Sequence, residues 1–116
     1  MKRRFRLTRT IDFQRVRRRG KSFANPLVVL MVYSNTLSLV RIGVAASQAV
    51  GKAVERNKAK RRLRACVQQL LPGLRPGWDL VLLARKRTNQ ADFSELCHAI
   101  RSLLIRAEML DSMYGN

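Results

Sequence analysis

Residues 52–64 carry seven Lys and Arg side chains and one acid, Glu55. On a helix, spacing of i, i+3, i+4 and i+7 places four polar side chains on one face: Asn57, Lys60, Arg61 and Arg64. Lys58 and Arg62 form a second basic ridge beside that face. Like charges at this spacing repel one another, so a polyanionic partner explains them better than an ordinary solvated face does. The chemistry expected is the neutralisation of phosphates.

The acidic residues are not arranged for catalysis. A protein nuclease needs clustered carboxylates for metal ions, or an acid and a base within reach of one phosphate. Five acids outside the basic segment are expected to lie singly on helices and loops: Asp12, Asp79, Asp92, Glu95 and Glu108. His98 is the only histidine, so a mechanism with two histidines is excluded, and a structural role is expected for it. We therefore predict no catalytic residue and no metal site in this polypeptide.

Length and charge limit the class of protein. A chain of 116 residues with 47% hydrophobic content is expected to form one domain over 1–116, with residues 1–8 and 110–116 flexible. A net charge of +17 suits a nucleic acid or an anionic membrane surface. Of the 24 Lys and Arg residues, 18 precede residue 65. The first 64 residues therefore code most of the binding surface.

Two further patterns concern the cellular compartment. The longest apolar run, 27–33, is shorter than the ~20 residues needed to cross a bilayer. Residues 8–20 provide no apolar stretch of a signal peptide after the basic N-terminus, so a cytoplasmic location is expected. Cys66 and Cys97 lack the CxxC spacing of a metal or redox site. Both cysteines are expected to be reduced core residues.

The elements that position the basic segment follow from the hydrophobic pattern. A short helix is predicted from about residue 10 to Gly20, followed by two strands, 27–33 and 39–46, that are expected to pair as a hairpin. The basic helix comes next, then a buried strand over 78–84 and a last helix that starts at the capping box Asp92-x-x-Glu95. The order α-β-β-α-β-α predicts an α+β sandwich. The apolar stripe that docks the basic helix is Ala59, Leu63, Cys66, Val67 and Leu70.

Motif spacing, element order and length together resemble the bacterial ribonuclease P protein family over nearly the whole chain. The most specific match is Arg56-Asn57-Lys58, followed by Lys60, Arg61 and Arg64, which resembles the family's Arg-Asn-Arg segment. Supporting matches are Asp12-Phe13-x-x-Val16 with Gly20, Arg41-x-Gly43, and residues 79–85.

The resemblance implies both a fold and an activity. The fold implied is a small sheet with a left-handed βαβ crossover around the basic helix, as in the second domain of a small-subunit ribosomal protein. The activity implied is that of an accessory subunit in a ribonucleoprotein endoribonuclease, whose catalytic RNA removes the 5′ leader of precursor tRNA. No cofactor is expected on the protein alone, whereas Mg²⁺ is expected in the RNA-containing holoenzyme. The implied partners are the catalytic RNA and precursor tRNA, with no membrane and no small-molecule substrate.

The resemblance and the charge of the helix indicate two sets of site residues. The RNA-binding set is Lys52, Arg56, Asn57, Lys58, Lys60, Arg61, Arg62 and Arg64. The set for a leader-binding cleft between the first helix and the sheet is Arg9, Phe13, Arg17, Met31 and Tyr33. Phe13 is as well explained by a core position as by the cleft, because an aromatic residue on a helix stripe usually packs inward.

Four positions depart from the family pattern. Gln48-Ala49 stands where Lys-Lys is common, Lys58 replaces a bidentate Arg by a point charge, and Arg17 stands where many relatives carry a second aromatic. Two alternatives remain open at this point. One is a structural, ribosomal-type RNA-binding protein with no role in cleavage. The other is a cationic membrane-surface protein anchored by residues 8–19, although the apolar face of that helix is narrow.

Overall fold

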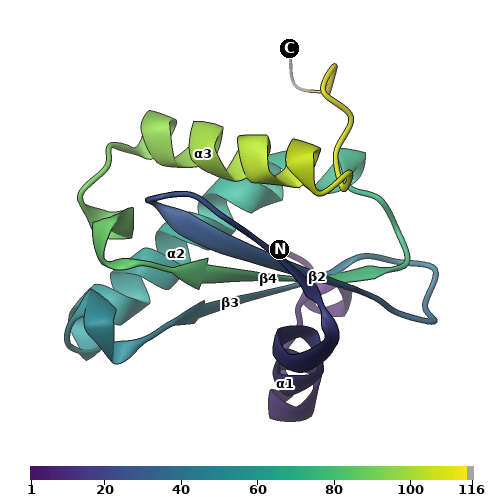
Figure 1. Cartoon of the computed structure of the whole chain (residues 1–116), viewed down its shortest axis with the longest axis horizontal. Helices are drawn as coiled ribbons and strands as arrows, with labels where there is room; N and C mark the ends of the chain where they lie inside the picture. The colour runs from purple at the N-terminus through teal and green to yellow at the C-terminus, as the bar shows by residue number, and fades with distance from the viewer. Residues whose placement is uncertain (115–116) are drawn as a thin grey trace.

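A mixed four-stranded sheet forms the centre of the computed structural model, which describes residues 1–114 (Figure 1). Helix α1 covers one face of the sheet, and α2 and α3 cover the other (Figure 1). The elements are α1 (Thr10–Arg19), β1 (Lys21–Ala24), β2 (Val28–Ser34), β3 (Arg41–Ala46), α2 (Ala53–Leu70), β4 (Trp78–Ala84) and α3 (Phe93–Arg106). The expected α+β class is confirmed, with one strand, β1, more than the sequence predicted.

The strand order is β1-β2-β4-β3, so the predicted hairpin between residues 27–33 and 39–46 is wrong. β4 lies between those two strands and pairs antiparallel with β2 and parallel with β3. The physical reason is that β4 is apolar on both sides, and such a strand is most stable at the centre of a sheet covered on both faces. The hairpin partner of β2 is the short edge strand β1, whose mostly exposed residues give little hydrophobic signal.

Because β3 and β4 are parallel, the chain must cross over the sheet between them, and α2 makes that crossover. This arrangement places one long side of α2 against the sheet, while a second side packs on α3 and the remaining outward side faces solvent. The left-handed sense that the resemblance implies for the crossover stays a prediction.

The larger core lies between the sheet and the helices α2 and α3. The predicted docking stripe of α2 is confirmed, since Ala59, Leu63, Cys66 and Val67 are buried and Leu70 packs against the same core. On α3, Leu96, Ile100, Leu103 and Leu104 are buried, and so is Ala107 at its C-cap. The predicted N-cap is present as well, with the Glu95 backbone N–H donating to Asp92 Oδ1 at 2.8 Å.

The cysteines form a disulfide, so the prediction of two reduced thiols is wrong. Cys66 of α2 and Cys97 of α3 are bonded, with their Cα atoms 5.0 Å apart. Their separation of 31 residues hides this proximity in the sequence, because the packing of the two helices brings them together. The bond links the basic helix to α3.

The N-terminal segment lies against the outer strand of the sheet. The Leu7 backbone N–H donates to the Ile42 carbonyl oxygen of β3 at 2.8 Å, and the Leu7 side chain is buried. At the other end of the chain, Leu110 is buried and bridges to Leu74. Residues 115 and 116, part of the flexible end expected from the sequence, lie outside the described residues.

Candidate nucleic-acid interface

The outward side of α2 carries the predicted phosphate-binding residues. Lys52 precedes the helix as its N-cap residue, and Asn57, Lys58 and Arg61 are exposed along it, while Lys60 is half-buried. Every ion pair between described residues involves Asp12 or Asp79. Within residues 1–114, therefore, none of the cations on α2 has a carboxylate partner. The structure therefore brings together a row of positive charges that the protein itself does not neutralise.

Two arginines of the predicted set also hold the protein's own backbone. Arg56 Nη1 donates to the Gly51 carbonyl at 2.8 Å. Arg62 Nη1 and Nη2 donate to the carbonyls of Thr88 and Ala91, at 2.6 and 2.5 Å. Arg62 thus fastens α2 to the loop between β4 and α3, a contact between residues far apart in the sequence. A guanidinium has five N–H donors, so both arginines keep further donors.

Arg64 lies beside a second cation that the sequence prediction missed. It lines a hollow of about 210 Å³ together with Arg6 and Phe13. Burial, and after it the positive charge of Arg6, lower the pKa of Arg64. Two cations held this close favour an anion between them. Arg6 reaches this position because the N-terminal segment pairs with β3, a long-range contact that local sequence does not reveal.

The residues predicted for a leader-binding cleft lie on α1 and the neighbouring strand β2. Arg9 and Arg17 are exposed and Tyr33 is half-buried, whereas Met31 is buried among the residues that pack under α1. Phe13 combines both of its predicted roles, because it packs against this small core yet stays partly exposed and lines the 210 Å³ hollow. The structure brings four of the five side chains at least partly to the surface of the α1 side.

The Phe13 ring packs directly against the backbone of β3 at Gly43. A Cβ atom added at Gly43 would lie 2.5 Å from Cζ of Phe13, so no side chain fits between the ring and β3. Gly51 has a different role: its φ of +137° suits glycine and turns the chain into α2. Both glycines therefore serve the backbone geometry.

Asp12 and Asp79 do not lie singly, as the sequence suggested, but converge on Arg41. The Arg41 guanidinium donates from Nε and Nη2 to the two oxygens of Asp79 at 2.8 and 2.7 Å, and its Nη1 lies 3.5 Å from Asp12 Oδ2. Hydrogen bonding to Asp79 raises the pKa of Arg41. The network ties α1 to the sheet and gives both carboxylates a guanidinium partner. Sequence spacing could not show it, because the acids are 67 residues apart and meet only through Arg41.

The other acids and the histidine are remote from this network. Asp92 caps α3, and Glu95, His98 and Glu108 are exposed. Within residues 1–114, no three His, Cys, Asp or Glu side chains gather as a metal site. None of the helices described is both long enough and apolar enough to span a membrane.

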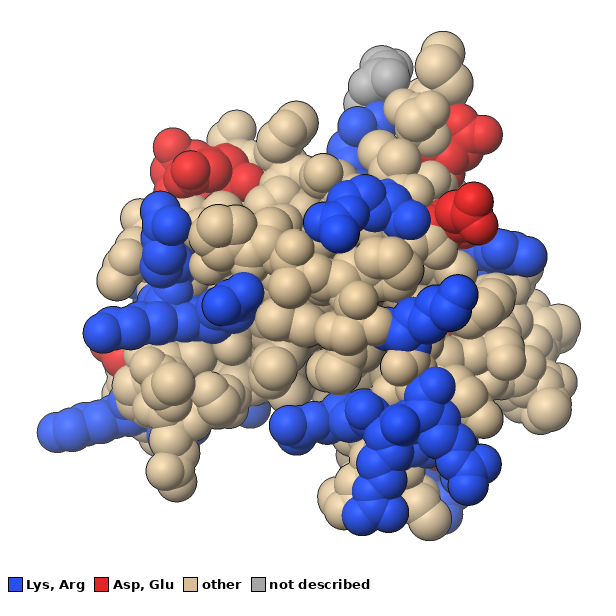
Figure 2. Space-filling view, viewed as in Figure 1, with Lys and Arg blue, Asp and Glu red and all other residues tan. Residues whose placement is uncertain are grey.

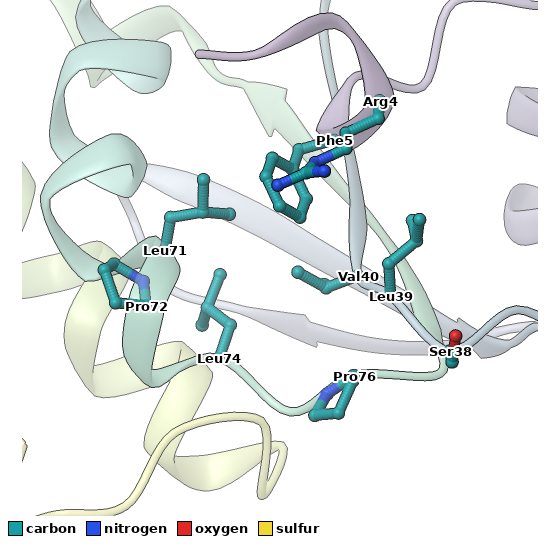
Figure 3. A pocket seen from close by; sticks show the side chains of 9 residues that line it. All are labelled: Arg4, Phe5, Ser38, Leu39, Val40, Leu71, Pro72, Leu74 and Pro76. Carbon is teal, nitrogen blue, oxygen red and sulfur yellow. The ribbon is translucent and has the colours of Figure 1, made fainter.

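A separate hollow of about 660 Å³ lies at the other end of α2, between the N-terminal segment and residues 71–76 (Figure 3). Its walls are mostly apolar, including Phe5, Leu71 and Leu74, and the Arg4 guanidinium lies 4.9 Å from the centre of the Phe5 ring. Among the described residues, Arg4 is the only charged one that lines it. The hollow therefore holds no acid and base pair that could act on a phosphate.

Charge is unevenly spread over the face of the molecule shown in Figure 2. Lys and Arg side chains cover the α1 region at the bottom and extend across the middle, while Asp and Glu lie mainly along the top, over α3 and the C-terminal segment. This separation leaves a broad positive surface next to the sheet.

Comparison with known proteins gives consistent matches over the length of the chain. The family model Ribonuclease P matches residues 1–108. The ribonuclease P protein component of Dehalococcoides mccartyi is 37% identical over 110 residues, covering 95% of this chain and 90% of that protein. That of Clostridium botulinum is 40% identical over 97 residues, covering 83% and 87%.

Solved structures agree with these relatives. The RNase P protein of Staphylococcus aureus superposes with a TM-score of 0.83 at 26% identity, over 92% of this chain and 98% of that chain. The RNase P protein of Thermotoga maritima gives a TM-score of 0.78 at 30% identity, over 87% and 96%.

Proposed function

The chain belongs to the bacterial ribonuclease P protein family, and from that premise we propose that α2 binds the catalytic RNA while the α1 side of the sheet binds the 5′ leader of precursor tRNA. The family establishes the broader role. This protein is the subunit of a ribonucleoprotein endoribonuclease that processes tRNA, and ribonuclease P RNA is the partner that the family implies. A ribosomal-type protein without a role in cleavage is not favoured.

The observation that carries the proposal is the row of cations on α2 that have no carboxylate partner within residues 1–114. Lys52, Lys58 and Arg61 are exposed, and Lys60 and Arg64 are half-buried next to them. RNA phosphates would neutralise these charges and release counterions, which gives affinity without reading a base sequence. The same charges would reduce the repulsion between the catalytic RNA and its substrate, which are both polyanions. Arg56 and Arg62 would contribute their remaining donors while Arg56 holds the turn before α2 and Arg62 holds α2 to the loop between β4 and α3.

On the α1 side, we propose that Phe13 stacks on a base of the single-stranded leader. Its ring is held against β3 by the space at Gly43. Arg17 is exposed on the same helix, and Arg9 is exposed as the N-cap residue of that helix. Tyr33 would extend this surface, and Met31 would support it from below. Base stacking on an aromatic side chain contributes about 1 to 3 kcal/mol per base.

The phosphodiester chemistry is assigned to the RNA. Asp12 and Asp79 are occupied by Arg41, so the residues described do not fit a metal ion, and the Mg²⁺ expected in the holoenzyme would be held by RNA. A cytoplasmic location accords with this role and is part of the proposal.

Reconstitution tests the role of the subunit in cleavage. The protein is added to its catalytic RNA at low magnesium, and cleavage of precursor tRNA is measured with and without protein. Stimulated cleavage is expected, whereas no stimulation would contradict the assigned role of the subunit.

The leader contact has its own readout in the same reconstituted enzyme. Affinity is compared for precursor tRNA with a leader and for tRNA without one, using R9A/R17A and the control R18A, which removes an exposed arginine of α1 outside the predicted set. R9A/R17A should reduce the preference for the leader-bearing tRNA. An unchanged preference, with R18A also unchanged, would place the leader elsewhere.

A further inference from the structure

A second cationic surface lies at the β1 edge of the sheet, beside the end of α3. It surrounds a hollow of about 490 Å³, here named the β1–α3 hollow, which four cations line: Arg19, Lys21, Arg75 and Arg106. Phe23 and Trp78 also line it, and both pack against the core on the α3 side of the sheet. Neither the α2 surface nor the proposed leader contact uses these six residues.

Two of the cations are already stacked on the aromatic rings. The Arg75 guanidinium carbon lies 5.5 Å from the centre of the Trp78 ring, and that of Arg106 lies 5.9 Å from the centre of Phe23. Arg106 is also held by a hydrogen bond from Nη1 to the carbonyl of Ala24, at 3.3 Å. Flat guanidinium groups on aromatic faces provide platforms on which a further planar ring can stack.

The other two cations are brought to the hollow by Gly20. A Cβ atom at Gly20 would lie 2.5 Å from the carbonyl oxygens of Val16 and Val32, so only glycine allows α1 to pass this closely into β1. The two residues that flank this turn, Arg19 and Lys21, are both exposed. The close turn therefore sets two positive charges at the rim of the hollow.

The charges around the hollow are not balanced by the protein. Glu108 is the only acidic residue that lines it, and no ion pair joins that carboxylate to the four cations within residues 1–114. Cations gathered without carboxylates favour an anionic ligand, and aromatic platforms favour a planar one. A nucleotide in a single strand combines a planar base with a phosphate.

We propose that the β1–α3 hollow binds an unpaired nucleotide of RNA, with its base stacked at Trp78 and Phe23 and its phosphates next to Arg19 and Lys21. The inference rests on the proposed function, since it adds a second RNA contact to the same subunit. The β1–α3 hollow and the proposed leader contact lie at different places. Tyr33 borders both, whereas the other leader residues lie on the α1 side of the sheet. The nucleotide could come from the catalytic RNA or from precursor tRNA.

Trp78 is the only tryptophan of the chain, so its fluorescence reports on this hollow alone. The full chain is titrated separately with the catalytic RNA, with precursor tRNA and with a short single-stranded oligoribonucleotide. A base stacked on the indole should quench the emission of Trp78. Quenching by the catalytic RNA or by precursor tRNA identifies which RNA occupies the hollow.

The variant K21Q/R75Q removes two cations of the hollow. Its matched control R3Q/R18Q removes the same charge from two exposed positions outside both proposed RNA sites. Affinity for the RNA that quenches Trp78 should fall about 5- to 100-fold in K21Q/R75Q relative to the control. R75K keeps the positive charge but loses the planar guanidinium. It should therefore retain part of the affinity for RNA, and bound RNA should quench Trp78 less in this variant than in the wild type.

Two results would overturn the inference: no quenching by any of the three RNAs at saturation, or equal affinities of K21Q/R75Q and R3Q/R18Q with both proteins folded by circular dichroism. If the wild-type protein stimulates cleavage yet either result is found, the hollow is refuted while the proposed function stands. If the wild-type protein fails to stimulate cleavage, the proposed function fails, and the oligoribonucleotide titration still decides the hollow.

Discussion

Replacing Arg61 and Arg64 by alanine should flatten the salt dependence of RNA binding. Five cations of the α2 region have no side-chain hydrogen bond or ion pair among the described residues: Lys52, Lys58, Lys60, Arg61 and Arg64. If each neutralises one phosphate, the single-strand value of about 0.7 per contact gives a slope of about −3.5 for log K against log salt. Removing two contacts should change the slope to about −2.1.

The assay is fluorescence anisotropy of labelled catalytic RNA at fixed magnesium, with monovalent salt varied from about 50 to about 200 mM. Over that range, the slopes correspond to a loss of affinity of about 100-fold for the wild type and about 20-fold for R61A/R64A. Both side chains lie on the outer sides of α2, so the thermal unfolding of the double variant should resemble that of the wild type.

R62A is the control from the same helix. Because Arg62 holds the carbonyls of Thr88 and Ala91, its removal should lower the unfolding temperature and change the slope by no more than one contact, about 0.7. A folded R61A/R64A variant with the wild-type slope would refute the placement of these two arginines against phosphates. So would an unfolded R61A/R64A variant, since the reasoning assigns them no part in the core.

Three predictions concern stability, measured as the free energy of unfolding in urea. D79N should lose about 3 to 5 kcal/mol, because it leaves the Arg41 guanidinium without its main charged partner. The control E95Q, which changes an exposed acid, should lose less than about 1 kcal/mol. Similar losses in the two variants would contradict the structural role of the Arg41 network. G43A should lose about 1 to 3 kcal/mol, since its Cβ would collide with the aromatic ring packed on it, and wild-type stability would show that the ring moves freely. C66A/C97A should lose about 3 to 4 kcal/mol relative to the oxidised protein, as expected for a disulfide that closes a loop of 31 residues. Adding reductant to the wild-type protein should cause a comparable loss. An unchanged unfolding curve in reductant would argue against the disulfide.

The helices were predictable because their signals are local. The apolar stripe of α2 repeats at helical spacing, so Ala59, Leu63 and Val67 could be assigned to the core and the basic residues to the surface. The N-cap of α3 was equally visible, since Asp92 and Glu95 are three residues apart. In both cases, neighbouring residues of the pattern are only three or four positions apart, so one helical turn brings them together.

The errors concern contacts between distant segments. An alternation of apolar residues identifies a strand but not its neighbours. The sequence therefore predicts that β2 and β3 pair with each other, whereas in the structure each of them pairs with β4. Likewise, nothing near Cys66 in the sequence indicates Cys97, and nothing near Arg62 indicates the carbonyl of Thr88. Site prediction failed for Arg6 for the same reason, because only its pairing with β3 brings it near Arg64.

The position of β4 has a consequence for biosynthesis. It is the last strand in the sequence, yet it is the strand on which both β2 and β3 form their hydrogen-bonded ladders. A nascent chain that ends before residue 78 therefore lacks the centre of its sheet, although it already contains 19 of the 24 basic residues. Pairing that depends on such distant segments is slow to form. The chain must emerge from the ribosome through residue 84 before α2 has a complete sheet to dock on and its cations acquire a fixed arrangement.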